Sequence, residues 1–126
     1  MSIEEDLYAY MSTYAGLTEL VGTRIYPLVA PQNVQKPYCT YQKISTGRQY
    51  SHSGYSGLQR PRMQVSCYAE TYSQAKAVAA QVVAAVEAWS AANARVQAAL
   101  QENEQDFYDE ETKLYYVPVD IFCYYG

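Results

Sequence analysis

The segment 61-PRMQVSCYAETYSQAKAVAAQVVAAVEAW-89 decides the fold, because it changes from strand periodicity to helix periodicity within a few residues. Its first part alternates strictly, with Met63, Val65, Cys67 and Ala69 on one side and mostly polar residues on the other. Such alternation predicts a strand that buries one face and leaves the other exposed.

The second part of this segment, residues 72–89, predicts a helix. Thr71 and Gln74 stand at the spacing of a capping box, in which each side chain satisfies a free backbone N–H at the start of a helix. The alanines allow this helix to pack closely on a sheet. Its apolar positions at helical spacing are Ala75, Val78, Ala79, Val82, Val86 and Trp89.

Toward the C-terminus the pattern predicts a second hairpin. Residues 95–109 suit a strand that becomes polar at its far end, a turn follows at 109–112, and 113–126 forms the last strand. Pro118 lacks an N–H, so we expect this strand at an edge of the sheet or beside a bulge. The residues predicted to share its buried face are Tyr115, Val117, Val119, Ile121 and Cys123.

Toward the N-terminus, residues 2–16 predict a helix with Ser2 and Glu5 as a capping box and Gly16 as its end. A short helical turn at 17–22 and an extended piece broken by prolines at 23–32 follow, before a strand at 38–45. The predicted order is α-β-β-β-α-β-β. We therefore expect one α+β domain over 1–126, with a mainly antiparallel sheet of about four to five strands packed by two main helices.

The connection 45-STGRQYSHSGYSGLQR-60 is too long for an ordinary hairpin, which has a loop of about 2–5 residues. It holds the only histidine, His52, but neighbouring serines give no triad geometry, so no catalytic residue is predicted. Its glycines match no phosphate-binding spacing. We interpret 46–60 as a long flexible loop, and a merely flexible polar connector stays open as the alternative.

Tyrosine, serine, glycine and arginine together are typical of adaptable protein-contact loops. Fifteen of the aromatic residues are tyrosine, against two phenylalanines and one tryptophan. Tyrosine suits interfaces because its ring packs while its hydroxyl stays hydrated. The candidate contact residues of this loop are Arg48, Tyr50, His52, Tyr55 and Arg60.

Charge and cysteine content exclude several other functions. The net charge of −4 argues against nucleic acid as a main ligand. Cys39, Cys67 and Cys123 are far apart and each lies in an apolar run, so we expect buried free thiols rather than a zinc site. The acidic run 102–111 lacks the order of a calcium loop and suits a solvated hairpin tip. We expect no cofactor, no metal, no membrane span and no secretory signal.

Several stretches resemble the tail completion proteins of long-tailed phages, a family that is similar to tail terminators and occurs also in prophages and gene transfer agents. The resemblance covers nearly the whole chain. None of its motifs is catalytic, so it implies a fold and a structural role. The matching stretches are L-x-x-L-V-G-x-R-I-Y-P at 17–27, P-Y-x-x-Y at 37–41, Q-V-S-C-Y-A-x-T-Y-x-x-A-K at 64–76 and 113-KLYYVPVDIFCYY-125.

The resemblance implies a subunit that assembles with itself into a ring, commonly a hexamer, in the tail or neck of the virion after assembly in the host cytoplasm. Such a ring caps the tail tube, ends its polymerisation and presents the surface that joins the head. Its implied partners are the tail tube protein and head–tail connector proteins, with DNA passing through unbound. A head-side adaptor or stopper ring is the alternative, and a small enzyme or ligand-binding module is a remote one.

Overall fold

The structure is a computed structural model that describes residues 3–45, 48–51, 54–59, 61–92 and 96–125, with side chains described for 4–44, 61–89 and 104–123. Its helices are α1 (Ile3–Met11), α2 (Ala15–Val21) and α3 (Tyr72–Ala92). Its strands are β1 (Ile25–Pro27), β2 (Tyr38–Ser45), β3 (Arg48–Ser51), β4 (Gly54–Gln59), β5 (Arg62–Ala69), β6 (Val96–Glu104), β7 (Phe107–Asp109) and β8 (Leu114–Tyr125).

The main sheet runs β1-β2-β5-β8, and β6 and β7 both pair with the far side of β8. Only β1 runs parallel to its neighbour, and the other pairs are antiparallel. The body of the sheet is thus five strands wide, as the sequence predicted. The α+β class and its mainly antiparallel sheet are confirmed.

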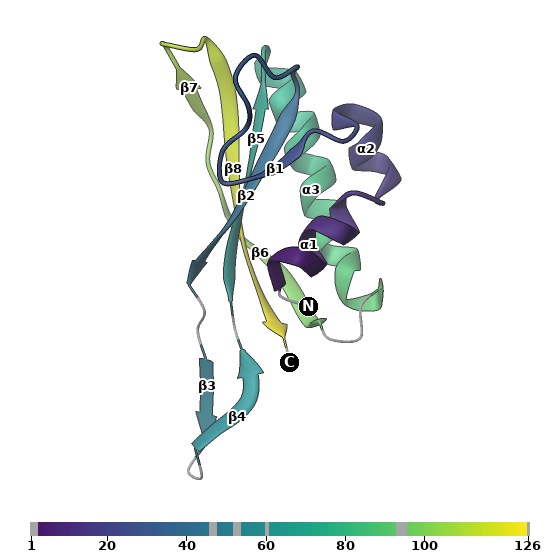
Figure 1. Ribbon diagram of the computed structural model, residues 1–126, viewed down its shortest axis with the longest axis vertical. Helices are drawn as coiled ribbons and strands as arrows, with labels where there is room; N and C mark the ends of the chain where they lie inside the picture. The colour runs from purple at the N-terminus through teal and green to yellow at the C-terminus, as the bar shows by residue number, and fades with distance from the viewer. Residues whose placement is uncertain (1–2, 46–47, 52–53, 60, 93–95, 126) are drawn as a thin grey trace.

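The helices cover one face of this sheet (Figure 1). The alternating residues of β5 that were predicted to face inward are fully buried, and so is the predicted apolar face of α3. Thr71 Oγ1 accepts a hydrogen bond from the N–H of Gln74 at 3.2 Å, which confirms the start of α3. Trp89 closes this core, and its ring stacks against Tyr10 of α1 with centroids 6.3 Å apart.

The N-terminal helix is shorter than expected. It ends at Met11, and a separate helix α2 begins at Ala15, so Gly16 lies inside α2 rather than ending the first helix. Thr13 follows the end of α1 and its hydroxyl donates to the carbonyls of Ala9 and Tyr10. At Gly16 a Cβ would lie 2.2 Å from the side-chain Oε1 of Gln81 on α3. The glycine here permits helix packing, and the helix-ending glycine is Gly22, whose φ is +61°.

The connection predicted as a loop contains two strands. β3 and β4 pair antiparallel and continue the β2–β5 hairpin beyond the body of the sheet (Figure 1). Sequence reasoning missed them because serine and glycine lower strand propensity, whereas pairing with a partner strand satisfies the backbone regardless of propensity.

The last strand, β8, lies inside the sheet, so the prediction that Pro118 is on an edge strand was wrong. The other possibility, a position beside an irregularity of the sheet, agrees with the structure. The carbonyl of Pro118 accepts from the N–H of Gln105 at 3.3 Å, in the interruption between β6 and β7. In an antiparallel strand the N–H and C=O of one residue point to the same side. The nitrogen of Pro118 therefore points toward the gap between β6 and β7. The sheet loses no hydrogen bond there, although proline has no N–H to donate.

Candidate protein-contact surfaces

The face of the sheet opposite the helices carries a ladder of aromatic rings. Tyr38 on β2 stacks on Tyr68 of β5 with centroids 4.8 Å apart and planes 10° apart. Tyr68 stacks in turn on Tyr116 of β8 at 5.3 Å, and Tyr116 on Phe107 of β7 at 5.2 Å. The register places all four rings in one row across four strands. Cross-strand pairs of this kind stiffen the sheet and leave a flat, amphipathic surface.

A parallel row of polar side chains lies farther along the same face. Gln42 Nε2 donates to Gln64 Oε1 at 3.1 Å, and Gln64 Nε2 donates to Asp120 Oδ1 at 2.8 Å. The three residues stand on β2, β5 and β8 at matching register. The exposed face is therefore ordered by side-chain ladders, and an incoming partner would meet a pre-formed surface.

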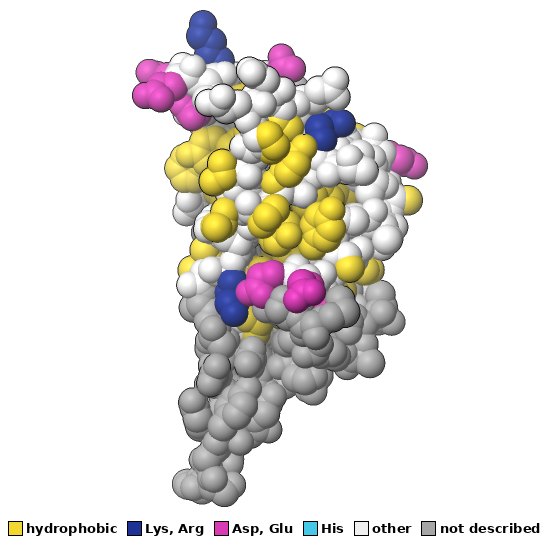
Figure 2. Space-filling model, viewed as in Figure 1, with side chains coloured by type: hydrophobic (Ala, Val, Ile, Leu, Met, Phe, Trp, Pro, Cys, Tyr) yellow, Lys and Arg dark blue, Asp and Glu magenta, His cyan; other side chains and the backbone are white. Residues whose placement is uncertain are grey.

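A groove of about 290 Å³ opens at the end of the aromatic ladder, between the β1–β2 connection and the β7–β8 turn. Its lining includes Tyr38 and Tyr68 from the ladder, Asp109 and Leu114 from the β7–β8 side, and residues 28–31 of the connection. Figure 2 shows hydrophobic side chains gathered over this connection, and acidic side chains beside a basic one where β7 meets β8. The segment 109-DEETK-113 holds three acidic residues and one lysine. The groove is thus apolar on one lip and acidic on the other.

The apolar lip consists of Leu28 and Val29, which are 67% and 77% exposed. The N–H of Val29 bonds the carbonyl of Pro27 at 2.6 Å, which makes a γ-turn centred on Leu28 with φ +60°. A leucine in this region is sterically strained. Leu28 also borders a second hollow of about 310 Å³ beside Tyr41 and Lys43. Large exposed apolar side chains held by a strained turn make this segment a candidate contact site.

Arg24 fixes the base of this turn. Its Nε donates to the carbonyl of Pro37 at 2.9 Å and its Nη2 to the carbonyl of Leu20 at 3.4 Å. The guanidinium thus ties α2 to the start of β2, on both sides of the β1–β2 connection. Arg24 belongs to the stretch L-x-x-L-V-G-x-R-I-Y-P, so this family-like motif has a structural use here.

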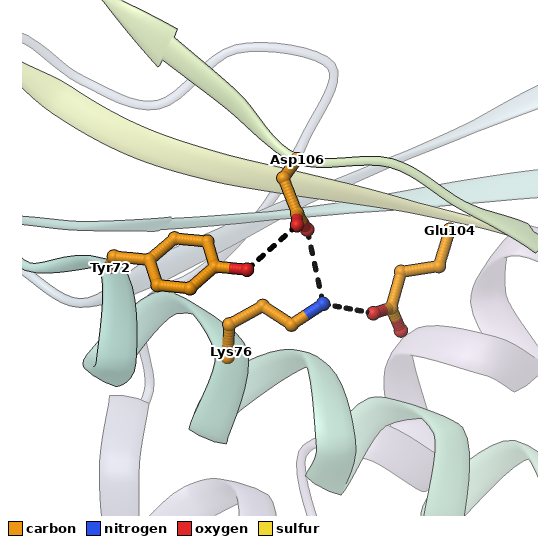
Figure 3. A network of polar contacts seen from close by, with 4 residues as sticks. All are labelled: Tyr72, Lys76, Glu104 and Asp106. Atoms are coloured by element: carbon orange, nitrogen blue, oxygen red, sulfur yellow. Dashed lines mark hydrogen bonds and ion pairs between the residues drawn. The ribbon is translucent and has the colours of Figure 1, made fainter.

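A polar network anchors α3 to the segment where β6 ends and β7 begins (Figure 3). Lys76 forms ion pairs with Glu104 and with Asp106, the latter at 3.0 Å, and the Tyr72 hydroxyl donates to Asp106 at 2.8 Å. The network holds the segment between β6 and β7, from which β7 and its aromatic Phe107 continue.

The charges of this network shift its proton equilibria. Hydrogen bonds from Tyr72 and Lys76 lower the pKa of the Asp106 carboxyl. Hydrogen bonds to Glu104 and Asp106 raise the pKa of Lys76, and the bond to Asp106 raises the pKa of the Tyr72 phenol. All three groups therefore keep the protonation state that the network needs across neutral pH.

The groove floor is electrostatically suited to a cation. Burial, the neighbouring Tyr68 and then Asp109 raise the pKa of Tyr38. Burial chiefly raises the pKa of Tyr68, with Tyr116 and Asp109 adding to it against the hydrogen bonds from Thr40 and Ser66. The Asp109 carboxylate thus acts on both phenols, and a carboxylate beside aromatic faces is a favourable setting for an arginine or lysine.

The cysteines are free and buried, as predicted. Cys39 and Cys67 face each other across β2 and β5. Hydrogen bonding of the Cys67 thiol to Cys39 and burial raise the pKa of Cys67, and burial raises that of Cys123 to about 12. Thiols in this state are poor nucleophiles. Within residues 3–45, 48–51, 54–59, 61–92 and 96–125, no group of three His, Cys, Asp or Glu could hold a metal ion.

Three of the five predicted contact residues lie on the strands of the projecting hairpin. Arg48 and Tyr50 lie on β3 and Tyr55 lies on β4, with Tyr50 directly opposite Tyr55 in the ladder. His52 and Arg60 lie outside the described residues. The hairpin is thus set apart from the groove and the aromatic ladder rather than joined to them.

Sequence reasoning missed the groove. The signal for its apolar lip was present in 27-PLVAP-31, where aliphatic residues stand between prolines in a segment that lacks strand alternation. The aromatic ladder could be found only by aligning strands, because Tyr38, Tyr68 and Tyr116 belong to three different hairpin arms.

Among the helices of the described residues, none is long and apolar enough to cross a bilayer. Comparison with known proteins gives a family match and matches to solved structures. Residues 5–125 match the family described as "Tail completion protein gp17". A chain of the virion of a native gene transfer agent particle superimposes with a TM-score of 0.81, at 17% identity, over 98% of this chain and 94% of that one.

No curated protein matches the sequence. The likeness to the gene transfer agent chain shows a shared fold at this low identity, whereas the family match spans nearly all of the sequence. The predicted resemblance is thereby confirmed. The chain belongs to the tail completion protein family and is a structural component of a phage-type tail rather than an enzyme.

Proposed function

We propose that this protein is the ring-forming subunit that completes the tail: it caps the tail tube, ends tube polymerisation and presents the surface to which the head connector binds. The observation that carries the proposal is the exposed sheet face, with its aromatic ladder and the exposed lip at Leu28 and Val29. A pre-ordered aromatic surface of this kind is suited to permanent contact with other proteins.

The ring that we propose is made of copies of this chain, and such rings are commonly hexamers in proteins of this type. Each subunit of the ring needs two different contact surfaces, one for each neighbour. A ring forms when one patch of a subunit binds a different patch of the next. The tail tube protein and the connector proteins would then bind the two flat sides of the ring. The net charge of −4 suits a wall past which DNA travels without adhering.

The test is deletion of the gene followed by electron microscopy of the particles. Tail completion predicts tubes of uncontrolled length that lack heads, and tubes of normal length would contradict it. Finished tails of correct length that fail to join heads would instead assign the protein to the head side, as an adaptor or stopper ring.

Complementation with point variants refines this test. Tyr50→Ala combined with Tyr55→Ala is expected to weaken assembly while the melting temperature stays nearly unchanged, because the hairpin carrying both residues projects beyond the main sheet. Exposed Glu87→Arg on α3 is the matched surface control. A large loss of thermal stability in the tyrosine pair would show that the hairpin belongs to the core.

A further inference from the structure

The groove and the projecting hairpin lie at opposite ends of the molecule. Figure 1 shows the β1–β2 connection and the β7–β8 turn at one end of the long axis, and β3–β4 at the other. The groove lies between the connection and the turn. A hairpin so placed cannot reach the groove of its own chain, so any contact between the two joins different copies.

The groove has the chemistry of a receptor for a cationic, aromatic segment. Leu28 and Val29 give an apolar lip, and the stacked rings of Tyr38 and Tyr68 give a flat floor. Asp109 lines the groove, and Glu110 and Glu111 follow it on the exposed turn. Guanidinium groups stack on aromatic faces and pair with carboxylates, so an arginine-bearing segment is the favoured occupant.

The hairpin has the complementary composition. Residues 46–60 contain two arginines and one histidine and no acidic residue. Tyr50 and Tyr55 are register partners in its ladder, which places two aromatic residues at one level of the arm. Tyrosine and arginine are the residue types that dominate binding energy at protein contacts.

We propose that the β3–β4 hairpin of one copy binds in the groove between the β1–β2 connection and the β7–β8 turn of the next copy. The inference rests on the proposed ring function and specifies its contact between subunits. Because the two surfaces differ and lie at opposite ends, the contact is head-to-tail, the type that closes into rings. Opposite charges on hairpin and groove fix the partner and the direction of assembly.

Charge reversal tests the contact directly. Arg48→Glu on the hairpin and Glu111→Arg on the groove rim are each expected to raise the concentration at which oligomers form by about tenfold. The double variant puts opposite charges together again and is expected to recover most of this loss. Mass photometry over a concentration series, with and without purified tail tubes, measures the oligomer, and melting temperatures check that each variant is folded.

Glu87→Arg supplies the control, since it makes the same charge change as Glu111→Arg, but at an exposed position of α3. Oligomers that form equally well with Arg48→Glu and Glu111→Arg would overturn the hairpin contact and leave the ring function standing. Loss of tube binding in Arg48→Glu with unchanged self-assembly would overturn it too, and would assign the hairpin to the tube protein. Absence of any wild-type oligomer, even on tail tubes, would overturn the ring function itself.

Discussion

The aromatic ladder predicts a measurable coupling between Tyr38 and Tyr68. Stacked pairs contribute about 0.5–1.5 kcal/mol beyond their burial. Tyr38 has one such neighbour in the ladder and Tyr68 has two, and the Tyr68 hydroxyl also bonds with Thr40 and Ser66. We expect Tyr38→Leu to lower the free energy of unfolding by about 1–1.5 kcal/mol and Tyr68→Leu by about 2–3 kcal/mol.

A double-mutant cycle separates the stacking from these other losses. The free energies of unfolding of wild type, both single variants and the double variant are measured by urea denaturation, at concentrations where the protein is monomeric and with the m-value unchanged. The expected coupling between Tyr38 and Tyr68 is about 1 kcal/mol. The matched control is Tyr38 with Tyr116, because both stack on Tyr68, which separates them.

The control pair is expected to couple by less than about 0.5 kcal/mol. If Tyr38 and Tyr68 couple no more strongly than Tyr38 and Tyr116, the rings do not form a cooperative ladder. The exposed face would then not be ordered in advance of binding.

Three further predictions concern the turn, the helix end and the polar network. Gly22→Ala is expected to cost about 1–3 kcal/mol in chemical denaturation, because φ of +61° is unfavourable for a side chain, and an equal stability would refute this. Leu28→Gly is expected to change the melting temperature little, because relief of backbone strain in the folded state offsets the greater entropy of the unfolded chain. Oligomer formation by this variant is expected to weaken, because the apolar side chain is lost. The lowered pKa of Asp106 means that its stabilisation is present above its unfolded pKa of about 4 and is lost as pH falls through the folded value. The melting-temperature difference between wild type and Asp106→Asn should therefore shrink below about pH 4, and a difference independent of pH would contradict the network.

The body of the fold follows from local patterns in the sequence. Alternation in β5 and helical spacing in α3 each depend on burial of one face, and both survive intact in the structure. Two helical pieces at the N-terminus were predicted, but their boundary was placed at Gly16, whereas α1 ends at Met11 and α2 begins at Ala15. Gly16 lies against the side chain of Gln81, which is 65 positions further along the chain. Periodicity reports burial along one element and says nothing of which remote residue it meets.

The contact surfaces were predicted only in part. Composition drew attention to the hairpin, because its tyrosines and arginines stand together in sequence. The groove is built from four strands and two connections, with Leu28 and Asp109 brought to one place by strands paired far apart in the chain. Register sets such a site, and register depends on tertiary pairing that one sequence does not display.

The β3–β4 hairpin continues the β2–β5 pair outward, and this has a consequence for how the protein can diversify. Side chains alternate with a period of two, so inserting two residues in each arm lengthens the hairpin and returns every later residue to its original face. Each such step would move the tip outward by about 7 Å while the buried rows of β2 and β5 keep their partners. The reach of the arm can therefore change between related proteins by whole steps, with the body of the sheet unaltered.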